Sequence, residues 1–389
     1  MARFGEYIPS ERLTFWIWKI LGIWATQDES RLYRAFRWIY HFTFTIVYLF
    51  CIFISSFFKE TMAELWSDVM FILLTELAMF TKTVITVRKF ETVYRLHWET
   101  ISDEFRPISE WETRVHGAFF SRFSTAMLGY YLCSFLTLWA HLGFLFEYKF
   151  PFFSWFFWLP LGRANLTNYY IIFAYQMFGM LGHLSLNVSG DIQHAYLLAT
   201  AGIQLDFLYE RLTKLPIPTS NSSIGKDHYR ETLIQHIEHY ERIYRFVKEI
   251  EDTFSMAIFV QICASGVTVC ATILRLSTVN LATDLGTDGA PMVFYLVAML
   301  TQIFLPCYFG NEVTLKSVKL TNALYTADWF RLAGVSDRKE MAALMLRTNK
   351  PIALKAGHFF NYNLEAFTST LNTAYSIYAV VSKKNREQA

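Results

Sequence analysis

The sequence predicts an all-α integral membrane protein with seven transmembrane helices, and three observations support that fold class. Of its 389 residues, 53% are hydrophobic and only 17% are charged, whereas soluble domains carry about 25% charged residues. Several apolar runs reach the roughly 20 residues that a helix needs to cross a bilayer. Lysine and arginine gather in alternate loops, as the positive-inside rule requires.

Seven segments are expected to span the membrane. They are residues 38–57, 66–86, 123–146, 168–188, 256–279, 292–310 and 359–382. The second is the weakest, because it contains Asp68, Glu76 and Lys82. The third is the clearest, because it is apolar almost throughout.

Basic residues predict the orientation. With a cytoplasmic N-terminus, 27 of the 35 Lys and Arg residues fall in cytoplasmic segments and 7 fall outside. Seven spans then leave the C-terminus outside. The same topology puts the sequon Asn165-Leu166-Thr167 in an outer loop, so Asn165 is a candidate glycosylation site.

The cytoplasmic segments are expected to be helical. Residues 228–255 place Leu233, Tyr240 and Val247 on one apolar face that continues into the fifth span. Residues 311–330 extend the sixth span in the same way. The predicted organisation is a cytoplasmic segment (1–37), spans one to four with cytoplasmic extensions (38–210), anchor helices with spans five and six (211–358), the last span (359–382) and an extracellular tail (383–389).

The last span carries a polar stripe. At steps of 4, 4, 3, 4 and 4 residues, one helical face presents Asn361, Glu365, Ser369, Asn372, Ser376 and Val380. Unsatisfied polar groups in hydrocarbon cost several kcal/mol each, so this face must contact protein or water. From this segment alone, a water-filled path and a packed polar seam are equally supported.

The sequence offers no basis for an enzyme and implies no cofactor. It contains no glycine-rich phosphate loop, CxxC pair, HExxH or GxSxG motif. His236 and His239 flank Glu238, but a solvated helix face explains them better than a metal site. Glu76 and Glu365 are intramembrane carboxylates, for which functional and structural roles both stay open. The net charge of +2 gives no reason to expect a nucleic-acid partner.

Aromatic side chains suggest a pocket in the outer halves of spans two, three, four and six. An apolar cavity with a few hydroxyl groups suits a small ligand of low polarity. The candidates are Phe71, Leu74, Thr75, Leu132, Phe135, Trp139, Tyr170, Phe173, Tyr175, Phe178, Phe294 and Tyr295. For any single residue, lipid contact or helix packing is the more economical explanation.

Two C-terminal stretches resemble a known family. PCYFGNEVTLKSVKLTNALYTADWF (306–330) and KPIALKAGHFFNYNLEAFTSTLNTAYSIYAVVSK (350–383) are similar to the C-terminal motifs of insect odorant receptors. The N-terminal RLTFWIWKILGIW is a weaker match. The chain lacks the TY-plus-QF ending of the related gustatory receptors and the long loop insertion of the co-receptor, Orco, so it resembles a ligand-tuning subunit.

This resemblance implies a subunit of a tetrameric odorant-gated cation channel, assembled with Orco in the plasma membrane of olfactory neuron dendrites. The last helix would line the pore, with a constriction at Val380 and with Ser369, Asn372 and Ser376 below it. Lys384 would stand where the co-receptor has an apolar gate residue. The family's odorant pocket lies where the aromatic candidates gather, and its anchor domain corresponds to the cytoplasmic helices.

Two other seven-span or multi-span classes compete with this interpretation. A G-protein-coupled receptor-like chemoreceptor would have an outer N-terminus, and the basic residues indicate the opposite. That class carries an NPxxY motif in its seventh span, whereas the last span here has NTAY and no proline. A transporter would show inverted repeats or broken helices near the midplane, and neither is evident in the sequence.

Overall fold

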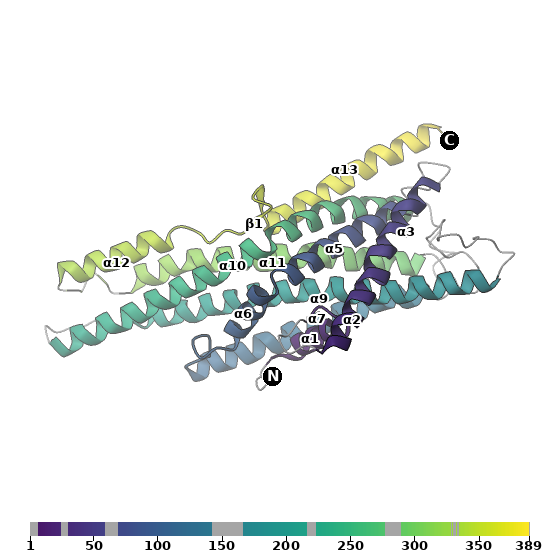
Figure 1. Cartoon of the computed structure of the whole chain (residues 1–389). Helices are drawn as coiled ribbons and strands as arrows, with labels where there is room; N and C mark the ends of the chain where they lie inside the picture. Colours follow the sequence, from purple (N-terminus) through teal and green to yellow (C-terminus); the bar gives the residue numbers. More distant parts are fainter. Residues whose placement is uncertain are drawn as a thin grey trace.

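A long helical bundle dominates the computed structural model (Figure 1). The structure describes residues 7–24, 30–58, 69–141, 166–215, 223–276, 289–327, 329, 332 and 334–388. Its helices are α1 (Pro9–Ile20), α2 (Arg31–Tyr40), the π-helix η2 (His41–Val47), α3 (Tyr48–Ser55), the 3-10 turn η3 (Ser56–Phe58), α5 (Phe71–Arg88), α6 (Phe90–Thr100), α7 (Glu110–His141), α9 (Leu166–Thr213), α10 (Ser223–Leu276), α11 (Ala290–Thr326), α12 (Val335–Thr348) and α13 (Leu364–Gln388). Two short strands, β1 (Lys355–Ala356) and β2 (Phe360–Asn361), pair antiparallel just before α13.

Each of the seven expected spans overlaps a helical segment within the described residues, and the first span covers α2, η2 and α3 in succession. Within the described residues, four helical segments are long and apolar enough by themselves to cross a membrane: Arg31–Phe58, Thr167–Thr213, Asp227–Leu276 and Ala290–Thr326. The remaining spans correspond to α5, α7 and α13, whose sequences mix apolar residues with charged or polar ones. Such helices need neighbouring helices or water to cover their polar groups within a membrane.

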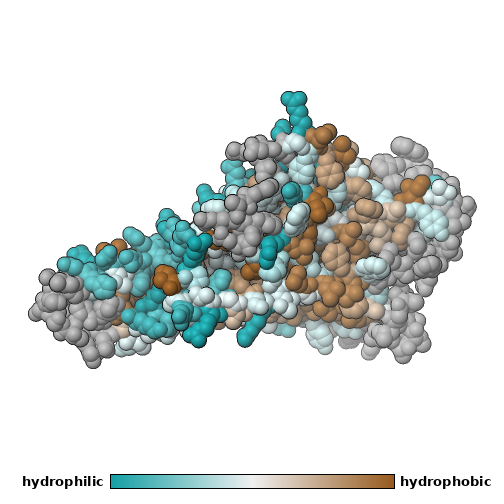
Figure 2. All heavy atoms as spheres, turned by 90° about the horizontal axis from the view of Figure 1, so that it is seen from below, coloured by the Kyte–Doolittle hydropathy of each residue, from teal (hydrophilic) through white to brown (hydrophobic). Residues whose placement is uncertain are grey.

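Hydrophobic and hydrophilic residues separate along the bundle. Figure 2 shows brown, hydrophobic residues over one half and teal, hydrophilic residues over the other. The hydrophilic half corresponds to the end of the molecule where Figure 1 shows α12 and the beginning of α10. This is the distribution expected of a bundle that spans a bilayer and projects helices beyond it.

Helix α9 lies at the centre of the bundle. It packs against α1, α5, α7, α10 and α11, and its side chains are buried almost continuously from residue 185 to 208. Two glycines bring α9 close to the first span. A Cβ added to Gly182 would lie 1.9 Å from the hydroxyl oxygen of Tyr40, and one at Gly179 would lie 2.5 Å from the ring of Tyr48. The absence of side chains at these positions is therefore what lets the first span pack here.

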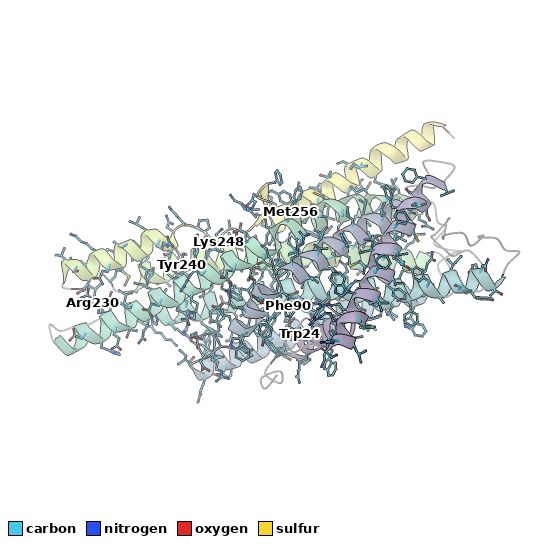
Figure 3. The ribbon with its side chains drawn as sticks, viewed as in Figure 1. Trp24, Phe90, Arg230, Tyr240, Lys248 and Met256 are labelled. Atoms are coloured by element: carbon cyan, nitrogen blue, oxygen red, sulfur yellow. The ribbon has the colours of Figure 1, made fainter. Side chains whose placement is uncertain are left out.

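The predicted amphipathic helix is confirmed as the first half of α10. Figure 3 labels Arg230, Tyr240, Lys248 and Met256 along this helix, which continues without a break to Leu276. The expected apolar face is buried, including Leu233, Ile243, Phe246, Val247 and Ile250. The predicted extension of the sixth span is also confirmed, because α11 runs on to Thr326.

The start of the last span needs a correction. The segment 359–382 was expected to be helical throughout, but α13 begins only at Leu364 and Asn361 lies in β2. Positive φ angles at Gly357 (56°) and His358 (65°) turn the chain into the β1–β2 hairpin. The helix then starts after Asn363, whose side-chain Oδ1 accepts a hydrogen bond from the N–H of Ala366 at 2.9 Å.

Candidate functional site

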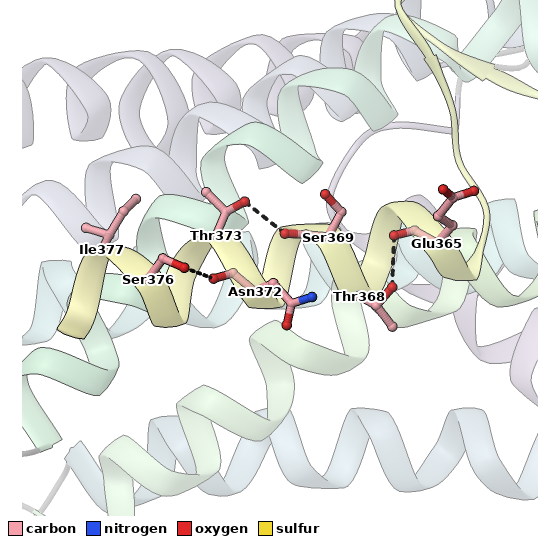
Figure 4. Close-up of a pocket in the computed structure, with 7 residues that line it drawn as sticks. All are labelled: Glu365, Thr368, Ser369, Asn372, Thr373, Ser376 and Ile377. Atoms are coloured by element: carbon pink, nitrogen blue, oxygen red, sulfur yellow. Dashed lines mark hydrogen bonds between the residues drawn. The ribbon is translucent and has the colours of Figure 1, made fainter. Parts of the chain in front are cut away.

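The polar stripe on α13 forms an open groove (Figure 4). The groove measures about 460 Å³, and its lining residues are Glu365, Thr368, Ser369, Asn372, Thr373, Ser376 and Ile377. Several hydroxyl groups bond back to the helix itself. Ser376 Oγ donates to the Asn372 carbonyl at 2.8 Å, and Thr373 Oγ1 donates to the Ser369 carbonyl at 2.9 Å. The helix backbone thus accepts these hydroxyl hydrogens, and the lone pairs of the hydroxyl oxygens remain available to accept hydrogen bonds from water.

The opposite face of α13 holds the helix on the bundle. Ala374 is 2% exposed, and the Phe367 ring lies 5.5 Å from that of Phe304 on α11. Thr370 packs against Gly266 of α10. Glu365, Ser369 and Asn372, by contrast, are exposed. Nothing else in the described part of this chain covers the stripe, so it faces either water or another polypeptide.

Two of the predicted pore residues cannot be placed in detail. Val380 and Lys384 fall within α13 by backbone position, but their side chains lie outside the described residues. Asn165, the candidate glycosylation site, lies outside the described residues altogether. Their assigned roles stay predictions.

One group of predicted pocket residues meets inside the bundle. Thr75 Oγ1 of α5 and the Tyr295 hydroxyl of α11 are hydrogen-bonded at 2.8 Å, and Thr75 also approaches Met299 Sδ at 3.9 Å. Leu74 and Phe294, which precede Thr75 and Tyr295 in the sequence, are half-buried. The Cys133 thiol of α7 approaches the Phe294 carbonyl at 3.9 Å. The spans that the sequence paired for a pocket, α5, α7 and α11, thus come together here.

Phe135 and Phe173 also face inward, from α7 and α9. Phe135 is half-buried against the main core, and Phe173 is 6% exposed. Tyr175 turns toward the first span, where its hydroxyl donates to the Thr43 carbonyl at 2.5 Å and its ring stacks on Phe44 at 5.3 Å.

The other group faces outward from the bundle. The exposed fractions are 61% for Leu132, 68% for Trp139, 45% for Tyr170 and 69% for Phe178. The structure therefore does not bring them together with the Thr75–Tyr295 pair. The side chain of Phe71, at the start of α5, lies outside the described residues.

A buried polar network was missed by the sequence analysis. Lys82 Nζ of α5 forms an ion pair with Asp191 Oδ1 of α9 at 2.6 Å and donates to Asn187 Oδ1 at 2.8 Å. Asp191 also accepts hydrogen bonds from Tyr130 of α7 at 3.2 Å and Gln261 of α10 at 2.9 Å. The sequence signal for this network was Lys82, a lysine within an expected span.

Glu76 and His183 form a second interior pair. Glu76 Oε2 lies 2.6 Å from His183 Nδ1, and the Tyr48 ring packs edge-on against the imidazole at 4.7 Å. The sequence marked Glu76 as an intramembrane carboxylate, and the structure supplies His183 as its neighbour. The contact gives the carboxylate a structural partner that ties α5 to α9.

The helical end beyond the expected spans contains its own electrostatic contacts. Arg211 Nε of α9 and Glu112 Oε1 of α7 form an ion pair at 2.7 Å. Although burial opposes the charged form of Glu112, the guanidinium and the backbone N–H groups of Ile108 and Ser109 hold its pKa below the usual range.

The expected solvated face at His236 and His239 needs a correction. His239 is half-buried, with its ring 6.0 Å from that of Phe105. Burial lowers the pKa of both histidines to about 4. Within the described ranges, no three His, Cys, Asp or Glu side chains are grouped as metal ligands would be.

These features define an integral membrane protein whose helices enclose polar contacts and whose last helix presents an uncovered polar face. A family model described as 7tm odorant receptor matches residues 62–375. The chain belongs to this odorant receptor family.

Full-length relatives support the assignment. Odorant receptor 94a of Drosophila melanogaster is 26% identical over 98% of this chain and 99% of its own length. Odorant receptor Or1 of Anopheles gambiae is 23% identical over 97% of this chain and 96% of its own length.

The fold matches a solved structure. The insect olfactory receptor OR5 from Machilis hrabei superposes with a TM-score of 0.78 at 18% identity, covering 95% of this chain and 96% of that one. A second structure of the same receptor, in complex with eugenol, also gives a TM-score of 0.78, at 17% identity. The seven-helix receptor fold expected from the sequence is thereby confirmed, and the family is one of receptors rather than enzymes.

Proposed function

We propose that this chain is the ligand-tuning subunit of an odorant-gated, non-selective cation channel in the plasma membrane of olfactory neuron dendrites. It assembles with the co-receptor Orco as a heterotetramer. The observation that carries the proposal is the uncovered polar stripe of α13, including Ser369, Asn372 and Ser376. A stripe of this kind is stable in a membrane if it faces a water-filled pore whose other walls come from partner subunits.

The ligand is a small volatile molecule of low polarity. Its proposed site lies beside the Thr75–Tyr295 hydrogen bond, and the inward-facing Phe135 of α7 and Phe173 of α9 are its aromatic candidates. A buried hydroxyl pair of this kind orients a ligand that carries one polar group. The eugenol complex of the similar olfactory receptor supports a ligand of this size class.

Gating follows from differential binding to two states. A ligand that fits the pocket better when the α13 helices separate shifts the population toward the open state. Val380 is the proposed constriction, where separation of apolar side chains admits water and then cations. Lys384 is the position at which this subunit's share of the pore should differ from that of the co-receptor.

Co-expression with Orco in oocytes tests the channel. Odour-evoked cation current is expected from the pair, and substitutions of Asn372 or Val380 should alter conductance, permeability or gating. Unchanged values for both positions, at normal surface expression, would remove α13 from the pore.

The same recordings test the pocket. Tyr295→Phe and Phe135→Ala should shift the odour profile, because both side chains face the bundle interior. Trp139→Ala, from the exposed group, decides whether the outward-facing candidates contribute. An unchanged profile in all three variants contradicts the pocket assignment.

An epitope at residue 1 separates the channel from its main rival. Labelling only after permeabilisation fits a cytoplasmic N-terminus and the odorant-receptor topology. Labelling on intact cells would favour a G-protein-coupled receptor-like chemoreceptor.

A further inference from the structure

Helix α11 contains a proline in its interior. Pro306 is buried, and its ring nitrogen carries no hydrogen. In an α-helix, residue 306 would donate its N–H to the carbonyl of residue 302, one turn earlier. Because Pro306 has no N–H, the carbonyl of Gln302 receives no backbone hydrogen bond from position 306. Gln302 is also fully buried. A buried carbonyl in this situation needs a donor from elsewhere.

Gln261 of α10 supplies that donor. Its side-chain Nε2 donates to the Gln302 carbonyl oxygen at 2.6 Å and to Asp191 Oδ1 at 2.9 Å. Gln261 is itself fully buried. One amide group thus ties the proline site of α11 to the ion pair that Asp191 forms with Lys82.

Along α11, the proline site lies between Tyr295 of the proposed ligand pocket and Gly310, which contacts the chain leading into the pore helix; Phe304, before the proline, also packs on Phe367 of that helix. On one side, α11 carries Tyr295, which is hydrogen-bonded to Thr75. On the other side, Gly310 is pressed against the chain that leads into α13, since a Cβ added there would lie 2.6 Å from the Tyr362 carbonyl oxygen. Movement of one part of α11 relative to the other therefore reaches the beginning of α13.

We propose that Gln261 is a positioning residue for a hinge in α11 at Pro306, through which the ligand pocket is coupled to the pore helix. This inference rests on the proposed function, because coupling requires that α13 line the pore. A ligand beside Tyr295 tilts the first half of α11. The tilt breaks no backbone hydrogen bond at residue 306, because proline makes none there. Gln261 holds the freed carbonyl and so fixes the direction of the bend.

A double-mutant cycle tests the hinge. Gln261→Met keeps the side-chain length but removes the donor, and it should raise the half-maximal odorant concentration at least tenfold. Pro306→Ala restores an N–H that can donate to the Gln302 carbonyl. In the Pro306→Ala background, Gln261→Met should therefore raise the half-maximal concentration less than threefold further.

Gln204→Met is the matched control. Gln204 is a buried glutamine whose Nε2 donates to the Phe105 carbonyl at 2.8 Å, away from the proline. With currents normalised to surface-labelled protein, this variant should keep the half-maximal concentration within threefold of the wild type. Equal shifts from Gln261→Met in both backgrounds, or no shift in either, would overturn the hinge.

Hydrogen exchange on the purified full-length chain gives a readout that does not depend on current. Amides at residues 303–310 should exchange at least tenfold faster in Gln261→Met than in the wild type, and this difference should disappear when Pro306→Ala is added. Equal exchange in Gln261→Met and wild type overturns the proposal even for a variant that fails to reach the cell surface. Absence of odour-evoked current from the wild-type pair would instead reject the proposed function.

Discussion

Replacing Lys82 by methionine leaves the Asp191 carboxylate buried without its cationic partner. In the wild type the two side chains are 8% and 2% exposed, and Nζ lies 2.6 Å from Oδ1. After the change, Asp191 keeps only the hydrogen bonds from Tyr130 and Gln261 among its described contacts. Breaking a buried ion pair in this way costs about 3–5 kcal/mol, mostly because the remaining charge is poorly solvated.

Asp191→Leu should be at least as damaging. It leaves the Lys82 ammonium with the Asn187 side chain as its described acceptor and also removes the acceptor of Tyr130 and Gln261. The double variant Lys82→Met/Asp191→Leu removes both charges. Its cost should fall well below the sum of the single changes, because apolar replacements of buried pairs are often close to neutral.

Thermal unfolding of a fluorescent fusion, followed by size-exclusion chromatography, measures these effects. The average unfolding entropy per residue implies about 0.8 kcal/mol per degree for a chain of this length, so each single variant should melt about 4–6 °C lower. The melting temperature of the double variant should lie at least halfway back from that of the single variants to that of the wild type. A double variant that melts as low as the sum of the two singles would refute the view that stranded charge causes the damage.

Two further predictions concern a close contact and a buried acid. Gly310→Ala should lower the melting temperature, because the new Cβ would meet the Tyr362 carbonyl oxygen at 2.6 Å; Gly129→Ala, with no atom within 4 Å of its Cβ, should not lower it. Burial raises the pKa of Glu11 well above 4.5, so its contribution to stability is present below pH 4.5 and is lost as pH rises through the folded-state pKa. Glu11→Gln should therefore melt increasingly above the wild type between pH 5 and 8. His97 Nδ1 lies 3.7 Å from Glu11 Oε2, and burial lowers the pKa of His97 to about 3. Above about pH 6.5 this histidine is neutral in the folded and the unfolded chain, so the comparison there isolates Glu11. Parallel melting curves of the two proteins between pH 6.5 and 8 would contradict the assigned pKa shift.

The helices and the polar stripe could be read from the sequence because both depend on local periodicity. Residues 228–255 repeat their apolar positions at helical spacing, and the structure shows that face buried. The beginning of α13 was placed too early, because apolar content at Phe359 and Phe360 resembles a span. The positive φ angles at Gly357 and His358 form a hairpin that no hydropathy pattern records.

The candidate pocket divides into residues that the structure brings together and residues that it separates. Spacing along α7 put Leu132, Phe135 and Trp139 in one group, but only Phe135 turns toward the core. Helix rotation decides which aromatic side chains face inward. That rotation is set by packing against several neighbours, and the span part of α7, which is apolar almost throughout, does not encode it in its own composition.

The sequence by itself determined the class of this protein: a membrane-spanning odorant receptor with a long amphipathic helix and a polar last span. Tertiary structure alone decided which polar groups meet. Lys82 pairs with Asp191, which lies 109 residues away in the sequence. Gln261 donates to the Gln302 carbonyl, which lies 41 residues away and receives no N–H from Pro306. The physical reason is that hydrophobicity along the sequence indicates which segments span the membrane. Which polar side chains meet depends instead on the relative depth and rotation of several helices.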